Sequence, residues 1–366
     1  MSKFSIHTSF FRKLLFASEL LVGGCHLLHA QSPSFQHPEA LPDYPVKGGV
    51  SGCYAGFAGD WLIVAGGCNF PDKPVAEGGK KMYYNKVYAL NVDRKPYRWQ
   101  ALPDLPRSVA YGVAVETDKG LVCIGGMNET GSFSDVFRIE MDADGACSYK
   151  TLPSLPVTIN NHAATGAGGC IYVAGGEQEG NGRGVYSLPA DGAQTWQKLS
   201  DNPGGKRVQP VLLSDGEVLY LAGGFTFDAA VKSCAVPSDM LRLRLSDNQW
   251  LSPVSLPSDG RYSMTGGTGV MCKGRLVLSG GVDPTVFKDA MEGRGPADYL
   301  KKPVDWYRFN KDVLVYSPEE KRWTVLYDIK GVNRAGGVLL HHKDAFYMIG
   351  GELKPGIRTA SVLRYK

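Results

Sequence analysis

Leu62-Ile-Val-Ala-Gly-Gly67 decides the fold of this 366-residue chain, because the same arrangement of an apolar run and a glycine pair recurs along it. Each run has the β-branched and aromatic residues that are typical of a buried strand. Paired glycines permit the positive φ and the close backbone approach needed where a strand ends. Six such pairs are present, and their second glycines are Gly67, Gly126, Gly176, Gly224, Gly281 and Gly351.

A second strand is predicted after each glycine pair, and in five repeats a third strand begins with an aromatic residue. These aromatic residues are Trp99, Tyr149, Trp196, Trp250 and Trp323. A phosphate-binding glycine loop would need a helix after it, whereas a strand follows here. Repetition at about 50 residues therefore predicts an all-β fold, a six-bladed β-propeller of the kelch type.

The two ends of the chain are expected to close this ring. The sixth repeat stops at Lys366, before its outer strand, and residues 37–45 form an unassigned segment near the other end. We predict that this segment supplies the missing strand, since pairing of the chain ends leaves no long unpaired edge. Residues 31–366 are thus expected to form one propeller domain.

The first thirty residues have the pattern of a signal peptide. Lys3, Arg12 and Lys13 precede an apolar run over residues 14–28, which is too short to span a bilayer. Cleavage near Ala30 would make the protein periplasmic or secreted. A lipid anchor at Cys25 is the alternative, because Val22-Gly-Gly-Cys25 has the form of a bacterial lipobox.

Composition excludes several partners and cofactors. The net charge of +4 provides no field that would attract nucleic acid. The eight cysteines form no CxxC pair and the seven histidines are scattered, so no metal site and no cofactor are predicted. A bridge between Cys53 and Cys68 stays open, and the sequence carries no signal for an oligomeric state.

In a propeller, the starts of the inner strands and the loops after the glycine pairs meet at one rim of the central channel. Arginines at this rim would suit an anionic ligand, because guanidinium groups hold carboxylates through paired hydrogen bonds. The alternative is that they pair with acidic neighbours and hold the blades together. The predicted rim residues include Asn69, Phe70, Arg107, residues 160–162, Arg207, Arg261, Asp283, Arg334, Glu352 and Lys354.

Two long insertions follow glycine pairs, at residues 68–85 and 282–311. Loops of this length on a compact repeat usually carry function. The second is rich in aromatic residues and is expected to form either a lid that stacks on a sugar ring or a packed surface cap. Its aromatic residues are Phe287, Tyr299, Trp306, Tyr307 and Phe309.

Gly350-Gly-Glu-Leu-Lys-Pro-Gly-Ile-Arg-Thr359 resembles the GE-x-KPG-x-RT signature of the kelch-type N-acetylneuraminate epimerases, also called sialic acid mutarotases. Further similar segments are Pro203-Gly-Gly-Lys-Arg207 with Gln209, Arg107 with Ala110-Tyr-Gly-Val113, and Gly280-Gly-Val-Asp283 with Phe287. The signature lies in the last blade here and mid-chain in the family, so the blade order looks cyclically permuted. A closed ring keeps its neighbour relations under such a permutation.

The resemblance implies an isomerase that interconverts the α and β anomers of N-acetylneuraminate, an acidic sugar, without a cofactor. It implies Glu352 as the proton-transferring carboxylate and Arg358 as its catalytic partner. The implied substrate-binding residues are Arg207, Arg107, Lys354, Gln209, Tyr111, Asp283, Phe70 and Asn69. Glu177 and Arg183 repeat the spacing of Glu352 and Arg358 but lack the Lys-Pro-Gly between them, so no role is expected for that pair.

Two other functions stay open at the level of sequence. A kelch ring can be a non-catalytic module that binds carbohydrate or protein, because the fold supports many functions. A sialidase, which is also six-bladed and binds the same sugar through arginines, is less favoured because residues 187–196 match its repeated aspartate motif only superficially.

Overall fold

The computed structural model describes residues 33, 35–258 and 260–366, and the structural statements below concern these residues. The predicted signal peptide and Cys25 lie outside the described residues. Within this part of the chain, none of the helices has the length and apolar character needed to traverse a bilayer.

The described chain folds into six antiparallel sheets of four strands each, which confirms the predicted propeller. The first two blades are β2 (Tyr54–Ala58), β3 (Trp61–Ala65), β6 (Val87–Asn91) and β7 (Trp99–Leu102), then β8 (Val113–Thr117), β9 (Gly120–Ile124), β12 (Val136–Met141) and β13 (Cys147–Leu152). The next two are β15 (Ala163–Ala167), β16 (Cys170–Ala174), β18 (Val185–Pro189) and β19 (Gln197–Lys198), then β20 (Val211–Ser214), β21 (Val218–Ala222), β24 (Asp239–Arg244) and β25 (Gln249–Ser255). The fifth is β26 (Gly267–Cys272), β27 (Arg275–Gly280), β28 (Val313–Ser317) and β29 (Arg322–Leu326), and the sixth is β30 (Val338–His342), β31 (Ala345–Ile349), β34 (Val362–Tyr365) and β1 (Glu39–Leu41).

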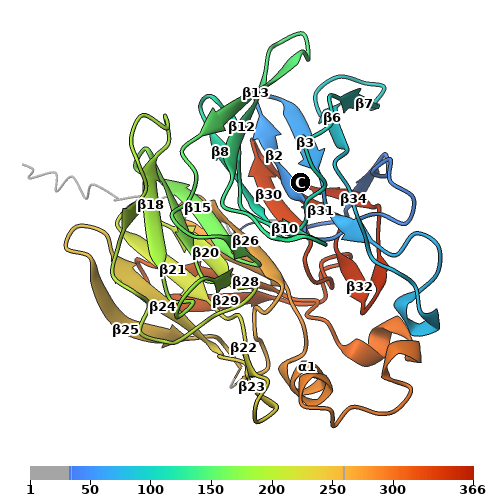
Figure 1. Ribbon diagram of the computed structural model, residues 1–366, viewed down its shortest axis with the longest axis vertical. Helices are drawn as coiled ribbons and strands as arrows, with labels where there is room; N and C mark the ends of the chain where they lie inside the picture. Colours follow the sequence, from blue (N-terminus) through green and yellow to red (C-terminus); the bar gives the residue numbers. More distant parts are fainter. Residues whose placement is uncertain (1–32, 34, 259) are drawn as a thin grey trace, which may run out of the picture. The chain divides into compact units, whose positions relative to one another are not determined.

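The inner strands form a closed circuit around the propeller axis. Strand β2 contacts β8, and the series continues through β15, β20, β26 and β30 back to β2; Figure 1 shows these strands gathered around the centre. The apolar core fills the spaces between neighbouring blades. For example, Ile63 and Ala89 of the first blade pack with Leu121 of the second, and all three are fully buried. Burial of the glycine-terminated runs therefore joins the blades into one unit.

The N-terminal strand closes the ring, as the sequence predicts. Strand β1 pairs antiparallel with β34, so the segment near the start of the chain becomes the outer strand of the sixth blade. Arg364 reinforces the pairing because its Nε donates to Glu39 Oε2 at 3.0 Å. Phe35 adds an apolar contact by stacking on Phe346, with ring centroids 4.5 Å apart.

Aromatic residues in or next to the outer strands connect neighbouring blades. Trp99 donates its indole N–H to the carbonyl of Pro42 at 2.9 Å, and Trp196 donates to that of Pro153 at 2.8 Å. Tyr149 makes the corresponding contact with Pro103 through its hydroxyl. We refer to these aromatic-to-carbonyl contacts as the interblade latches. They explain why the repeats combine an aromatic residue with a Leu-Pro turn.

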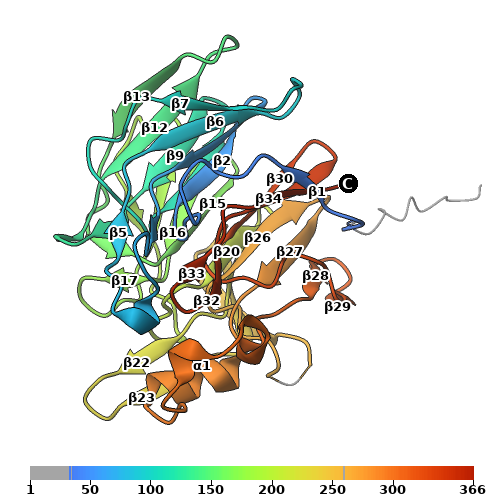
Figure 2. The same cartoon turned by 90° about the vertical axis from the view of Figure 1, so that its right-hand side faces the viewer.

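Short hairpins follow the glycine pairs on one side of the propeller, where Figure 2 shows β22, β23, β32 and β33 together with α1. These hairpins pair β4 (Cys68–Asn69) with β5 (Met82–Tyr83), β10 (Met127–Asn128) with β11 (Gly131–Ser132), β22 (Thr226–Asp228) with β23 (Ser233–Ala235), and β32 (Glu352–Lys354) with β33 (Ile357–Arg358). In the third blade, β17 (Glu177–Gln178) pairs instead with β14 (Ile159–Asn160). The fifth-blade insertion adds the helix α1 (Pro284–Met291), which the strand pattern did not predict, and two 3-10 turns, η2 (Tyr299–Lys301) and η3 (Val304–Tyr307). The first-blade insertion carries a third turn, η1 (Val75–Glu77).

Candidate active site

A ring of six backbone hydrogen bonds surrounds the mouth of the central channel. One residue from each blade donates its N–H to the carbonyl of the equivalent residue in the preceding blade, over 2.7 to 3.1 Å. All six have a positive φ, between 51° and 66°. We call this ring the collar, and its members are Gly52, Tyr111, Asn161, Gln209, Gly266 and Gly336.

The collar is asymmetric because three of its members are glycine and three carry side chains. Tyr111, Asn161 and Gln209 are consecutive around the ring, and Gln209 Nε2 donates to Asn161 Oδ1 at 3.0 Å. These polar side chains occupy one half of the mouth, whereas the glycine positions leave the other half open. A cavity of about 780 Å³ runs from this mouth along the inner strands. A volume of this size is typical of sites for small molecules.

Glu352 and Arg358 line this cavity as an ion pair on the β32–β33 hairpin. The hairpin register places the two residues opposite each other. Backbone hydrogen bonds in both directions between Glu352 and Ala335 attach the hairpin beside the collar. The turn Lys354-Pro-Gly356 reverses the chain, with Gly356 at a φ of 84° that favours glycine. The KPG signature therefore serves to bring the glutamate and the arginine face to face.

The charge of Glu352 is balanced between burial and nearby cations. Burial raises the pKa of this carboxyl, while Arg358, a backbone hydrogen bond from Gly356 and the charge of Lys81 act in the opposite direction. The side chain of Arg358 is only 5% exposed, and Phe70 lies 5.3 Å from its guanidinium as a cation–π partner. Arg358 Nε makes no hydrogen bond to any of the described residues. An anionic ligand would supply an acceptor for it.

Tyr111 also lines the cavity and lies close enough to Glu352 and Arg358 to interact with their charges. Lys81, from the first-blade insertion, donates to the Tyr111 hydroxyl at 2.9 Å. Cys68 Sγ lies 3.2 Å from the same oxygen. Burial and the nearby Cys68 raise the pKa of Tyr111, so the phenol is protonated at neutral pH.

The fifth-blade insertion forms an aromatic wall of the cavity, which consists of Phe287, Tyr299, Tyr307 and Phe309. Lys354 connects this insertion to the signature turn, because its Nζ donates to the carbonyl of Lys302 at 2.6 Å. Gly356, in the same turn, packs closely against Val75 of the first-blade insertion. Both insertions therefore contact the hairpin that carries Glu352, and they also contact each other.

Arg207 and Arg107 are not among the cavity-lining residues of the described chain. The Arg207 side chain is 2% exposed, and its NH1 lies 2.7 Å from Asp239 and donates to the carbonyl of Gly223 at 3.1 Å. Arg107 pairs with Asp135 at 3.1 Å. Both arginines thus pair with acidic neighbours, as the alternative interpretation expected, but each pair lies within one blade and does not join two blades. A carboxylate-binding role for either stays a prediction and would require its ion pair to open.

Asn69 and Asp283 make structural hydrogen bonds near the mouth. Asn69 is buried, and its Nδ2 donates to the carbonyls of Lys47 and Gly49 at 2.9 and 2.7 Å. Asp283 lines the cavity but caps α1 by accepting from Val286 N at 2.8 Å. Of the residues implied by the resemblance, five share the cavity wall, namely Glu352, Arg358, Tyr111, Gln209 and Asp283. Phe70 and Lys354 do not line the cavity, but Phe70 contacts Arg358 and Lys354 contacts the fifth-blade insertion.

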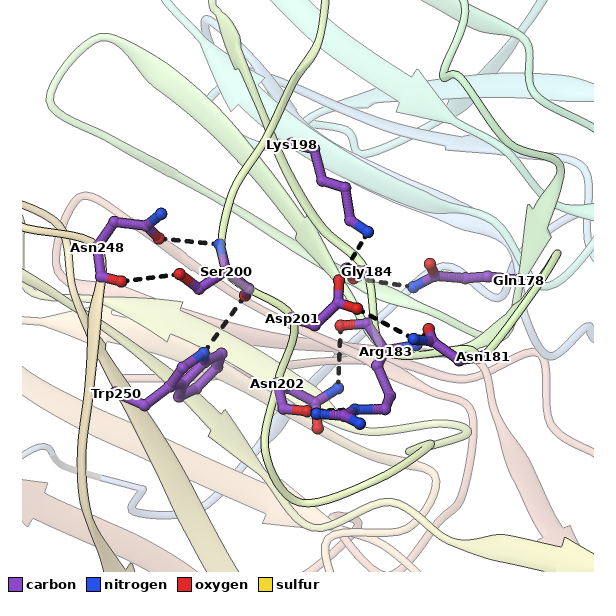
Figure 3. A network of polar contacts seen from close by, with 10 residues as sticks. All are labelled: Gln178, Asn181, Arg183, Gly184, Lys198, Ser200, Asp201, Asn202, Asn248 and Trp250. Carbon is purple, nitrogen blue, oxygen red and sulfur yellow. Dashed lines mark hydrogen bonds and ion pairs between the residues drawn. The ribbon is translucent and has the colours of Figure 1, made fainter.

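Glu177 and Arg183 show what the same spacing does without the Lys-Pro-Gly turn. Arg183 donates through Nε to the carbonyl of Asn202 at 2.7 Å, within the polar network between the third and fourth blades shown in Figure 3. Glu177 pairs instead with Lys206. Spacing alone therefore does not bring the two side chains together.

The sequence pattern did not indicate Lys81 as a site residue. It placed Asn161 at the rim but assigned it no role in the site. Lys81 lies in the predicted insertion 68–85, but nothing in its neighbours distinguishes it from Lys80. Its role depends on how the insertion folds back over the mouth. Cys53 and Cys68 are free, buried thiols. No cluster of three metal-ligating side chains occurs among residues 33, 35–258 and 260–366.

The fold and the site define a six-bladed β-propeller with a partly buried glutamate–arginine pair at its channel mouth. A family model described as N-acetylneuraminate epimerase matches residues 28–146 and 152–366. The chain therefore belongs to the N-acetylneuraminate epimerase family.

Individual relatives agree with this assignment. The N-acetylneuraminate epimerase of Salmonella typhi is 31% identical over 234 residues, which are 58% of each chain. That of Haemophilus influenzae (strain 86-028NP) is 28% identical over 229 residues, 59% of each. The chain thus matches less than two thirds of the length of these relatives. A solved structure titled "Structure of YjhT" covers 88% of this chain and 96% of its own, with a TM-score of 0.63 and 18% identity, and supports the fold.

Proposed function

We propose that this protein is a sialic acid mutarotase, an isomerase that interconverts the α and β anomers of N-acetylneuraminate. The observation that carries the proposal is the Glu352–Arg358 ion pair on the wall of the channel cavity. Membership of the epimerase family supports the same substrate. No cofactor is needed, because ring opening and closure require only proton transfer.

In this proposal Glu352 takes the proton of the anomeric hydroxyl while the bond between the anomeric carbon and the ring oxygen breaks. Arg358 orients the substrate carboxylate and balances the charge that develops, since a buried guanidinium binds carboxylates strongly. Gln209 and Asn161 offer amide groups to the sugar on the polar half of the collar. The aromatic residues of the fifth-blade insertion supply a face against which the sugar ring can stack, so this insertion would act as the expected lid.

Substitution of Glu352 by glutamine tests this function. The Glu352→Gln variant is expected to fold normally. Its catalysed rate of interconversion is expected to fall at least about 100-fold, which is within the range that general acid–base catalysis contributes. The measurement is the rate of α to β interconversion of N-acetylneuraminate followed by NMR. Glu177→Gln is the matched control, because Glu177 occupies the equivalent position in the third blade and pairs outside the cavity with Lys206.

The competing functions predict other outcomes. Wild-type protein that binds the sugar without accelerating interconversion would be a binding module. Release of the fluorophore from a fluorogenic sialoside would instead identify a sialidase. Full activity of Glu352→Gln would remove this carboxylate from the mechanism.

We further propose that the protein is exported and cleaved near Ala30. The basic and apolar pattern of residues 1–30 supports this proposal. Mass spectrometry of the N-terminus of the mature protein tests it. A diacylated Cys25 would identify a lipoprotein instead, and an intact Met1 would contradict export.

A further inference from the structure

Mutarotation requires two proton transfers, and Glu352 provides for one of them. One group must remove the proton of the anomeric hydroxyl while another gives a proton to the ring oxygen. We propose that Tyr111 is this second catalytic residue, and that Lys81 positions its hydroxyl. The inference rests on the proposed mutarotase function and adds a general acid to it.

The collar holds Tyr111 in place. Its N–H donates to the carbonyl of Gly52 and its own carbonyl accepts from Asn161 N, both at 2.7 Å. Its φ of 59° is uncommon for a residue with a side chain, and the residue lines the cavity. A Cβ at Gly52 would lie 2.8 Å from Tyr111 Cδ1, so the adjacent glycine provides the space for the ring. A strained backbone maintained by its neighbours is typical of functional sites.

The contacts of the Tyr111 hydroxyl direct its proton toward the cavity. Lys81 Nζ lies 2.9 Å from the phenolic oxygen, and an ammonium group can only donate. Cys68 Sγ lies 3.2 Å from the same oxygen and also within reach of the Ser51 carbonyl at 3.8 Å. Because the Lys81 ammonium occupies an acceptor position of the phenolic oxygen, the phenolic O–H is available to donate to a ligand. The Lys81 ammonium would also stabilise the phenolate that forms after proton transfer.

The proposed step balances without a co-reactant. Glu352 accepts the anomeric hydroxyl proton, the bond between the anomeric carbon and the ring oxygen breaks, and Tyr111 protonates the ring oxygen. The products are the open-chain ketone, a neutral Glu352 and a phenolate at Tyr111. The ketone group then rotates, and the hydroxyl that was the ring oxygen attacks the opposite face of the carbonyl carbon. This hydroxyl gives its proton back to the Tyr111 phenolate, and Glu352 returns the other proton to the carbonyl oxygen. The enzyme ends in its original state.

Substitution of Tyr111 by phenylalanine tests the role of the hydroxyl. Tyr111→Phe keeps the ring and is expected to lower kcat for interconversion about 100-fold or more, with KM changed less than about threefold. Tyr149→Phe is the matched control, since Tyr149 lies in outer strand β13 of the same blade and donates to Pro103. The control is expected to keep the wild-type rate.

Lys81 requires a separate test because it acts through Tyr111. Lys81→Met is expected to lower kcat at least about tenfold, and Lys81→Arg is expected to restore most of it by donating to the same oxygen. KM should stay near the wild-type value in both variants, whereas loss of substrate binding alone would raise KM and leave kcat intact. That second pattern would overturn the positioning role.

The outcomes separate the two proposals. If the wild-type protein does not accelerate interconversion, the proposed function fails. If the wild-type protein and Tyr111→Phe are equally active while Glu352→Gln is inactive, the function stands and Tyr111 is not the second proton-transfer group. A folded Tyr111→Phe protein, checked by circular dichroism, that has lost activity supports the inference.

Discussion

Burial and nearby cations act in opposite directions on the pKa of the Glu352 carboxyl group. Burial disfavours the charged form, while Arg358 and Lys81 favour it, and the pKa is raised overall. A carboxylate whose pKa lies nearer to neutrality is a stronger base and accepts a proton more readily from a sugar hydroxyl. Tyr111, Tyr299 and Tyr307 lie close enough to this carboxyl for its charge to raise the pKa of their hydroxyls.

The raised pKa predicts the acid limb of the pH profile. As the pH falls through the pKa, Glu352 becomes protonated and can no longer act as a base. Catalysed interconversion should therefore decline below a midpoint that lies above 4.5, the ordinary value for glutamate. NMR rates corrected for the uncatalysed reaction at each pH measure this midpoint. A rate that is constant down to pH 4.5 would contradict the prediction.

Glu116 offers a control for the same profile. It lies further along the cavity, accepts from Phe57 N at 2.8 Å, and has its pKa raised to about 7 by burial. If the midpoint belongs to Glu352, a Glu116→Gln variant should keep it unchanged. Disappearance of the acid limb in that variant would assign the titration to Glu116.

At the scale of elements, the interblade latches connect the outer part of each blade to the neighbouring blade, because sheet hydrogen bonds join strands only within a blade. Each latch connects one aromatic residue to one carbonyl of the neighbouring blade, as Trp196 does with Pro153. Removing the donor leaves a partly buried carbonyl without its partner, which typically costs about 1–3 kcal/mol.

The Trp196→Phe variant should therefore unfold with a free energy about 1–3 kcal/mol lower than the wild type. Urea denaturation measures the difference. Lys198→Gln, in strand β19 two residues after Trp196, is the control, because its exposed pair with Asp201 is expected to contribute little to stability. Equal effects of the two substitutions would show that the latch adds no stability of its own.

At the scale of the whole molecule, the strand near the N-terminus decides whether the ring is closed. Without β1, the β34 strand would present an unpaired edge, which favours association between chains. The residues that close the ring also bury apolar surface, since Leu41 and Phe35 are 4% and 7% exposed.

A chain that begins at residue 46 should consequently be less stable and should aggregate. Thermal unfolding and light scattering measure the two effects. A synthetic peptide of residues 33–45 added in excess should restore stability, because a ligand that binds only the folded state shifts the equilibrium toward it. A truncated chain that remains monomeric and as stable as the wild type would show that ring closure does not require β1.

The amino-acid sequence by itself determined the repeat, the number of blades and the closure of the ring. Those features follow from local patterns, namely apolar runs, glycine pairs and an unassigned segment near one end. The family resemblance implied the joint role of Glu352 and Arg358, and the short hairpin around the Lys-Pro-Gly turn places the two residues opposite each other by local geometry.

Only the tertiary structure decided which rim residues reach the cavity. The sequence pattern predicts Arg207 at the mouth of the channel. In the structure its guanidinium pairs instead with Asp239 of the same blade. Lys81 has no distinguishing neighbours, yet the folded insertion brings it to Tyr111. Side-chain direction near the collar depends on contacts between residues far apart in the chain, and local sequence patterns do not encode those contacts.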